Sequence, residues 1–576
     1  MDIKRAVLWF VMVVSAVTLW NNWGMYNGKP SMFAPKPIEV SAPQNDTAAN
    51  SNASVPAGTN PGAAATSTVA GETPVVAEPI TITTDLFKAV FSTEGGQLTH
   101  LELLQEKDTK SQWLWDVLLA KLHHTDTDAP PQNEVIFDDS PKLKYLAQTG
   151  LLGELPYPDH RSGYVARPGP RSLDNSDQVQ LILDSEKGGV KLTKIFTFKR
   201  GQYSIDVKHE VTNNTGAAIA PSLYLQLARD GTKPQTARFA PSTFNGAAVY
   251  TEADRFQKVT FEEIDKDKAE YAHKADNGWI ALIQHFFVSA FIPPQGTPRE
   301  IFTKKITKDL SKNIDRDLYV VGTVMPMGSI APGATSSMDA TLFSGPQETA
   351  LLDKVAPGFD LVKDYGKYFT VVAKPIFWVM EQIHKVLGNW GWTIVAFTVL
   401  MKLVFFPLSA ASYRSMAKMK VLTPKMQAIR ERHKADPQKM NQAMMELYKT
   451  EKANPVGGCL PVLIQMPVFI ALYSVLQASI ETRNAPWIGW IHDLSTPDPL
   501  SILPVLMAIS MFLQTKLNPA PADPVQAKVM MFMPLVFSAM FFTFPSGVVL
   551  YYVVNTTLSI AQQWVITKKM SAPKQA

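Results

Sequence analysis

The segment FTVLMKLVFFPLSAAS, residues 397–412, places a single lysine, Lys402, inside a hydrophobic run. No other charged residue occurs between Trp390 and Leu408, and this length is enough for a helix to cross a bilayer, which takes about 20 residues. An intramembrane charge costs at least about 2.5 kcal/mol, so such residues usually face a protein interior or water and mark a functional site. The alternative is that the lysine stem extends toward the interface near Leu408, as long basic side chains do. The segment alone leaves both interpretations open.

The N-terminal region has the pattern of a membrane anchor followed by a tether. Lys4 and Arg5 precede an apolar run from Ala6 to Trp20, and no small-residue cleavage site follows. This predicts an uncleaved signal-anchor helix over 1–24 with a cytoplasmic N-terminus. The stretch that follows is rich in Ala, Ser, Thr, Pro and Asn and cannot bury enough apolar surface to offset its ordering entropy, so we expect a flexible linker over 25–79.

Residues 80–350 have the alternation that is typical of β-strands. In YSIDVKHEV, 203–211, apolar and polar residues alternate, and VKLTKIFTF at 190–198 precedes it across the turn KRGQ. This pattern predicts an antiparallel hairpin. The apolar run ALIQHFFVSAFI, 281–292, predicts one buried strand. The whole region favours a large all-β sandwich, on the outer side of the membrane because the anchor runs outward.

Two amphipathic segments flank the Lys402 run. Within a connecting segment, 351–388, residues 368–388 have apolar side chains on one helical face and charges on the other. This predicts an interfacial helix, with docking onto the β domain as the alternative. Residues 412–455 carry ten Lys or Arg against four acidic residues, with helical apolar spacing on both sides of KADPQ. The basic excess predicts a cytoplasmic helical hairpin.

Four further apolar runs predict membrane spans. They are Leu460–Ala478, Leu500–Leu517, Val529–Phe544 and Val548–Ile566. With the anchor and the Lys402 run they make six spans with both ends cytoplasmic, which agrees with the distribution of Lys and Arg. The third of the four would be only about 24 Å long as a helix, against a hydrocarbon core of about 30 Å, and would thin the bilayer around it.

The predicted spans carry more polar side chains than lipid-facing helices need. The set is Thr398, Gln465, Ser474, Gln477, Asn555, Thr556, Thr557, Ser559, Gln562 and Gln563. Hydrogen bonds between helices account for most of them, because such residues commonly join helices in membranes. None of them neutralises a cation, so unless Lys402 extends to the interface or loses its proton it needs water. We therefore expect a hydrated groove around it rather than a dry bundle.

Composition excludes several other kinds of function. The net charge of +4 over 576 residues is too small to indicate nucleic-acid binding, and no DNA partner is expected. The single cysteine, Cys459, cannot form an internal disulfide. No His/Cys cluster has zinc-site spacing, and neither a phosphate-binding loop nor a nucleophile elbow occurs. The sequence therefore gives no indication of a cofactor.

Four motifs resemble those of the YidC membrane protein insertases. They are GNWGW at 388–392, NPVGGCLPVLIQMPVF at 454–469, WIHDLSTPDP at 490–499 and FPSGVVLYY at 544–552. The resemblance extends over the whole chain and is to the Gram-negative members, which have a large periplasmic domain. It implies a β-supersandwich in the periplasm, a five-helix insertase core over 389–569 that contains the hairpin 412–455, and a short basic tail, 570–576. It also implies a location in the bacterial inner membrane.

The same resemblance implies a function without enzymatic activity. Members of the family insert and fold nascent membrane proteins through a groove open to the cytoplasm and to lipid, alone or with the Sec translocon and its accessory subunits. By motif position Lys402 matches the basic residue that attracts the client, where the family usually has arginine, so a point charge replaces a planar fork. The other implied substrate-binding residues are Thr398, Gln465, Met466 and Tyr552. Further implied partners are membrane lipids and, at 412–455, a ribosome or targeting factor.

Two other functions compete with insertion. A secondary transporter also has a charge at the membrane midplane, but it usually has inverted repeats and discontinuous spans, and the sequence has no internal repeat. A membrane-tethered sugar-modifying enzyme is the second alternative, because large β sandwiches can bind carbohydrate. A fold alone does not establish that function.

Overall fold

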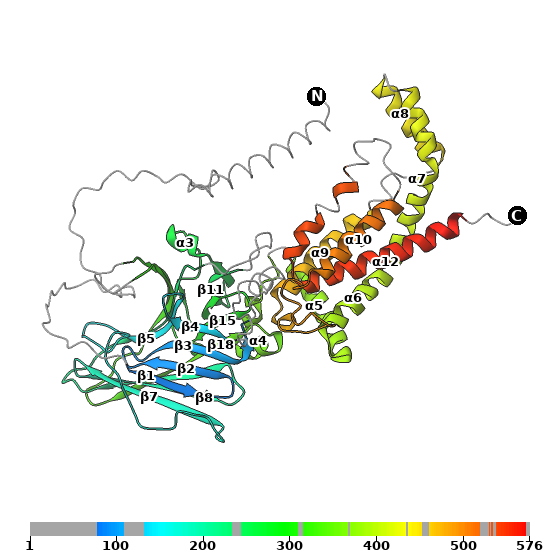
Figure 1. Cartoon of the computed structure of the whole chain (residues 1–576). Coiled ribbons are helices and arrows are strands. Elements are labelled where there is room, and N and C mark those ends of the chain that lie inside the picture. The colour runs from blue at the N-terminus through cyan, green and yellow to red at the C-terminus, as the bar shows by residue number, and fades with distance from the viewer. Residues whose placement is uncertain are drawn as a thin grey trace. The chain divides into compact units, whose positions relative to one another are not determined.

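The computed structural model describes residues 78–108, 132–232, 244–308, 315–366, 369–433, 436–451, 460–518, 529, 531–533 and 537–571. The predicted anchor, nearly all of the predicted linker, the tail after residue 571 and part of the predicted span Val529–Phe544 lie outside these residues. Strands form the first part of the described chain and helices form the second (Figure 1).

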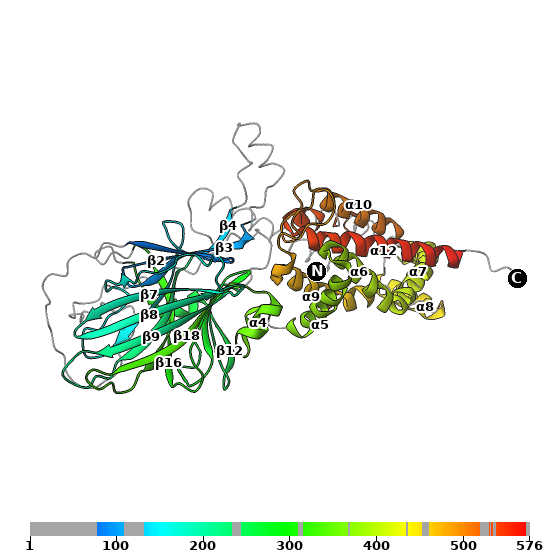
Figure 2. The ribbon, with the colours of Figure 1, turned by 90° about the horizontal axis from the view of Figure 1, so that it is seen from below.

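The described strands form two antiparallel sheets of nine strands each (Figures 1 and 2). The first sheet has the order β1 (Pro79–Thr83), β2 (Phe87–Ser92), β3 (Gln97–Lys107), β4 (Asn133–Asp139), β5 (Lys144–Leu152), β10 (Ser222–Asp230), β17 (Leu318–Pro326), β16 (Arg299–Ile306) and β13 (Lys274–Ala275). The second has the order β12 (Arg255–Val259), β11 (Gly246–Thr251), β14 (Trp279–Ile283), β15 (Phe287–Ile292), β18 (Thr335–Pro346), β9 (Ser204–Asn213), β8 (Val190–Lys199), β7 (Gln178–Lys187) and β6 (Val165–Ala166). A short helix, α3 (Phe261–Asp265), follows β12.

The two sheets pack face to face around one apolar core. In β9 every second side chain is buried, and Ile205 and Val207 are fully enclosed among core residues that come from both sheets. Each such side chain stabilises the fold by about 1.5–3 kcal/mol relative to an exposed position. Strands β8 and β9 pair antiparallel with Phe198 opposite Ile205, which confirms the predicted hairpin.

The prediction of one buried strand over 281–292 is wrong, because this stretch contains a hairpin. Strands β14 and β15 pair antiparallel, with Ile283 opposite Val288, and the residues between them make the turn. Alternation is missing because both faces of β14 are buried. One face meets the core between the sheets, and the other is covered by α4 (Thr349–Val355) and the short helix η2 (Phe359–Val362), whose side chains pack around Trp279.

Two titratable side chains lie inside the sandwich. The ammonium group of Lys194 in β8 donates hydrogen bonds to the carbonyl oxygens of Thr149 (2.8 Å) and Gly95 (2.7 Å). His209 is paired with Lys194 across β8 and β9, and its Nε2 lies 3.0 Å from the hydroxyl of Thr149. Burial disfavours the charged form of each group, which lowers the pKa of Lys194 to about 7 and that of His209 to about 3. Both groups connect the second sheet to β5 of the first.

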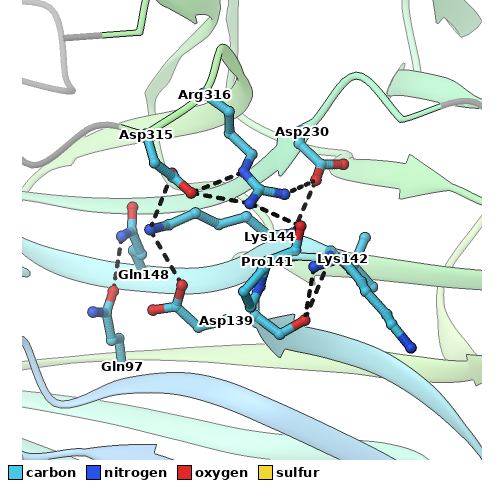
Figure 3. A network of polar contacts seen from close by, with 11 residues as sticks. Gln97, Asp139, Pro141, Lys142, Lys144, Gln148, Asp230, Asp315 and Arg316 are labelled. Atoms are coloured by element: carbon cyan, nitrogen blue, oxygen red, sulfur yellow. Dashed lines mark hydrogen bonds and ion pairs between the residues drawn. The ribbon is translucent and has the colours of Figure 1, made fainter. Parts of the chain in front are cut away.

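A network of charged side chains joins the ends of β5, β10 and the segment before β17 (Figure 3). Lys144 lies 3.2 Å from Asp139 and 3.7 Å from Asp315, and Arg316 contacts both Asp315 and the buried Asp230. Most of these groups are partly exposed, and pairs of that kind contribute about 0–1 kcal/mol each. The network therefore fixes the geometry of these strand ends more than it stabilises the fold.

The second part of the described chain is helical. Its elements are α5 (Thr370–Leu387), α6 (Trp390–Val404), α7 (Phe406–Arg432), α8 (Pro437–Thr450), α9 (Leu460–Ala478), η4 (Ile480–Thr482), α10 (Ile502–Leu517), η5 (Phe541–Thr543) and α12 (Ser546–Ser571). Helix α5 occupies the range predicted for an amphipathic helix, and its buried residues pack into the helical core rather than the β core. Helices α7 and α8 form the predicted hairpin, in which Lys425 and Glu451 lie 2.6 Å apart.

Helices α9, α10 and α12 occupy the ranges predicted for three of the spans. Among the described helices, none alone satisfies both the length and the hydropathy required to cross a membrane. Helices α6 and α7 satisfy both as a pair that is bent by 67°.

Candidate functional site

The Lys402 run is a broken helix rather than the continuous span predicted for Trp390–Leu408. Helix α6 ends at Val404, and α7 begins at Phe406 with Pro407 in its first turn. Proline disfavours a helical conformation in the residue before it and lacks an N–H, so a helix end here agrees with the local sequence. The break places Lys402 in the last turn of α6, where the helix dipole favours a positive charge.

Lys402 is buried against α12. Its side chain is 7% exposed, and its ammonium nitrogen donates a hydrogen bond of 2.7 Å to the hydroxyl oxygen of Ser559. Ser559 in turn donates to the main-chain carbonyl of Asn555 at 2.8 Å. Within the described residues no carboxylate forms an ion pair with Lys402. The ammonium group thus has one neutral partner for its three N–H donors.

A second hydrogen bond joins α9 to the same part of α12. The amide nitrogen of Gln465 donates to the side-chain oxygen of Asn555 at 2.7 Å. Lys402 and Gln465, which come from two different helices, therefore meet α12 at residues one helical turn apart. Asn555 and Ser559 are polar residues that the sequence assigned to contacts between helices, and that assignment agrees with these bonds.

The side chains of the other three predicted site residues lie in different surroundings. The hydroxyl of Thr398 is buried and donates to the carbonyl of Ile394 in its own helix, at 2.6 Å. Met466 is half-exposed on α9, next to Gln465. Tyr552 is part of an aromatic cluster with Phe469 and Phe541, with ring centroids 4.5 and 4.8 Å away.

The loop after η4 is bound tightly to the start of α12. The main-chain N–H groups of Ser546 and Gly547 donate to the carbonyls of Thr496 and Leu494, at 2.7 and 2.9 Å. The hydroxyl of Ser546 donates to the carbonyl of Asp493. Gly547 leaves little room for a side chain, because an added Cβ would lie 3.1 Å from the carbonyl oxygen of Leu494. These bonds hold the loop against the first turn of α12, at the end of the helix opposite to Gln563.

A buried ion pair connects the segment before α5 to η4, which follows α9. Lys363, just before α5, lies 2.8 Å from Glu481 in η4, and its ammonium group sits 4.0 Å from the centre of the Phe377 ring in α5. Burial lowers the pKa of Lys363, and the charge of Glu481 opposes that shift. The pair therefore connects three segments of the helical part.

The fold and the site together define a helical bundle of membrane character, with a buried cation, joined to a large β sandwich. The family described as "60Kd inner membrane protein" matches residues 382–574, and the family described as "YidC periplasmic domain" matches residues 79–379. Proteins named "Membrane protein insertase YidC" match over nearly the whole length. The one from Janthinobacterium sp. (strain Marseille) is 56% identical, over 99% of both chains. The one from Herminiimonas arsenicoxydans is 55% identical, over 100% of both.

The chain belongs to the YidC family of membrane protein insertases. It is a non-enzymatic insertase of the inner membrane with a β-sandwich domain in the periplasm, which confirms the function expected from the motifs. Its substrates are membrane proteins. The sequence resemblance predicted this class of protein correctly.

Proposed function

We propose that clients enter the membrane through a hydrated groove around Lys402, open to the cytoplasm and to lipid and closed on the outer side. The observation that supports this most is the buried ammonium group of Lys402, whose hydrogen-bond partner among the described residues is one neutral hydroxyl, that of Ser559. A charge in a dry apolar bundle would cost several kcal/mol without an opposite charge, whereas water or a client carboxylate removes much of that cost. The loop after η4, which is bonded to the start of α12 at Ser546 and Gly547, would close the outer end.

The topology that we propose has six spans with both termini in the cytoplasm. The anchor 1–24 and the linker 25–79 would tether the periplasmic domain 80–350, which is a β-supersandwich. The connecting segment 351–388 would lead through an interfacial helix into the five-helix insertase core 389–569. The short tail 570–576 would remain in the cytoplasm, because Lys568, Lys569 and Lys574 lie at this end of the chain.

The client would use two kinds of surface. Lys402 and Gln465 would attract its hydrophilic part, while its apolar segment moves into lipid along Met466 and Tyr552. Thr398 would support this path from α6, one turn before Lys402. The bent arrangement of α6 and α7 would carry the client from the hairpin to the groove, because the same helix pair contains both the charge and the start of 412–455.

We propose the partners from charge and position. The basic hairpin 412–455 would receive a client from a ribosome or a targeting factor, and the core would work alone or beside the Sec translocon and its accessory subunits. Lipids would surround the apolar residues that α6 and α10 expose, such as Leu403 (65%) and Ile509 (52%).

Cysteine labelling tests the groove directly. In a Cys459→Ala background, Lys402→Cys should react with a membrane-impermeant maleimide supplied from the cytoplasmic side and not from the periplasmic side. Val421→Cys, on the exposed face of α7, is the positive control, and Ile394→Cys, in the buried core of α6, is the negative one. Protection of position 402 equal to that of position 394 would mean that no wet groove reaches Lys402.

A further inference from the structure

A line of buried polar side chains continues along α12 beyond Ser559. Thr556, Ser559 and Gln563 are each at most 5% exposed, although an apolar residue would be easier to bury at these positions. Ser559 and Gln563 are four residues apart, so they lie on the same face of the helix, about 6 Å apart along its axis. Gln563 thus lies one turn further along α12 than Ser559, the partner of Lys402.

The side-chain amide of Gln563 is only half satisfied. The side-chain nitrogen of Gln563 donates to the side-chain oxygen of Asn518, at the end of α10, at 3.1 Å. Its side-chain oxygen is buried and has no hydrogen-bond partner in the described part of the chain. The side-chain oxygen of the adjacent Gln562 is in the same state. Two neighbouring acceptors on α12 are therefore enclosed and unpaired.

Unpaired buried acceptors need an explanation. Each costs about 1–3 kcal/mol relative to a paired group, and folded proteins leave few of them. The bond to Asn518 uses the amide nitrogen of Gln563 and leaves its oxygen unpaired. The ammonium group of Lys402 is bonded to Ser559, one turn before Gln563, and within the described residues no bond joins it to either glutamine oxygen. A molecule that binds here, such as water or a client, would supply the missing donor.

We propose that Gln562 and Gln563 bind main-chain N–H groups of the client's polar segment. This inference rests on the proposed function of the Lys402 groove and identifies what else the client meets there. Lys402 offers only donors, so it can satisfy carboxylates and carbonyls but not N–H groups. A segment that crosses before it has formed a helix exposes N–H groups, and each unsatisfied one costs several kcal/mol in an apolar medium. The two glutamine oxygens supply the acceptors.

Such a site makes recognition of the client independent of its sequence. Every client residue except proline presents a main-chain N–H, whereas only some tails carry the carboxylates that Lys402 attracts. The site therefore matters most for clients with neutral tails. A lipid ammonium group is a second source of N–H donors, but it is a single group, whereas a polypeptide presents donors along its length, which suits acceptors on two sides of α12 better.

Two variants distinguish the role of the unpaired oxygen of Gln563 from the role of its bond to Asn518. Gln563→Met has a similar length and no acceptor, whereas Asn518→Ala removes the bond to the amide nitrogen of Gln563 and keeps its oxygen. The reconstituted full-length protein would insert a synthetic client with a neutral tail, made once with amide linkages and once with three consecutive ester linkages in the tail. An ester has no N–H but keeps the shape of the chain.

With the amide client, Gln563→Met should slow insertion about three- to tenfold, the loss expected for one hydrogen bond, and Asn518→Ala should retain most of the wild-type rate. The ester client should slow the wild type by a similar factor and should slow Gln563→Met no further. The proposal would be overturned if Gln563→Met slowed the ester client, relative to the wild type with the same client, as much as it slows the amide client. It would also be overturned if Gln563→Met inserted the amide client at the wild-type rate.

Two controls identify the source of any failure. If the loss in Gln563→Met occurs only in vesicles that contain phosphatidylethanolamine, and not in vesicles of phosphatidylcholine and phosphatidylglycerol, the ligand is a lipid and the proposal is wrong. Lys402→Leu with an acidic-tailed client reports on the proposed groove itself. A normal rate in that experiment would contradict the proposed function, whatever Gln563→Met does.

Discussion

The buried histidine of the β sandwich predicts how the periplasmic domain responds to acid. The pKa of His209 is about 6.5 in an unfolded chain and about 3 in the folded domain, because burial disfavours its charged form and Lys194 lies beside it. A lowered pKa contributes stability that is complete above pH 6.5 and is lost as the pH falls toward 3. From these two values, His209 alone should reduce the free energy of unfolding by about 2 kcal/mol between pH 7 and pH 5.

The change to make is His209→Gln, which keeps a polar side chain that does not titrate. Hydrogen exchange of peptides from β8 and β9 in the full-length protein, corrected for the intrinsic effect of pH, gives the free energy of opening. The wild type should lose about 2 kcal/mol more than the variant between pH 7 and pH 5. His160, whose pKa burial lowers to about 4, is unchanged in both proteins and accounts for a shared loss. An identical pH dependence in the two proteins would refute the assignment to His209.

Three further results are expected. Replacing 412–455 by a short Gly/Ser loop should leave the protein in the membrane and abolish insertion of clients in a protease-protection assay; normal insertion would show that the hairpin is not needed to receive them. Deleting much of 80–340, with the anchor and interfacial helix kept, should leave insertion largely intact, and failure of a well-expressed deletion would place the activity outside the core. Glu481→Gln should destabilise the helical part by about 3–5 kcal/mol in thermal unfolding, because Lys363 stays buried without its opposite charge. The double variant Lys363→Met with Glu481→Leu removes both charges and should restore most of the lost stability. Equal losses in the single and double variants would count against the pair.

The sequence was most informative where one face of an element is wet. Alternation in 203–211 predicted β9 correctly, since one face of this strand packs in the core and the other face is polar. The hairpin inside 281–292 was missed because η2 and α4 cover the second face of β14 and β15, which removes the alternation. Its turn, Gln284–Phe286, also contains no glycine or proline to mark it.

The helix break at Phe405 had a signal that the hydropathy pattern hid. Pro407 marks the start of α7, yet the run from Trp390 to Leu408 is uniformly apolar and therefore looked continuous. Composition alone identified Lys402 as unusual. It did not identify Ser559 as its partner, because that contact depends on the register between α6 and α12, and the two residues are 157 positions apart in the chain.

Reversing the charge at position 402 tests most directly whether attraction by Lys402 drives insertion. One client would be made with an acidic tail, a neutral tail and a basic tail, and its insertion measured by protease protection with the wild type, Lys402→Arg, Lys402→Leu and Lys402→Glu at matched expression. We expect Lys402→Arg to insert the acidic client, Lys402→Leu to be impaired with it, and Lys402→Glu to be the worst, while Lys402→Glu should recover with the basic tail. If Lys402→Glu inserts the acidic client as well as the wild type does, electrostatic attraction is not the role of this lysine, and it serves only to position its helix in the membrane.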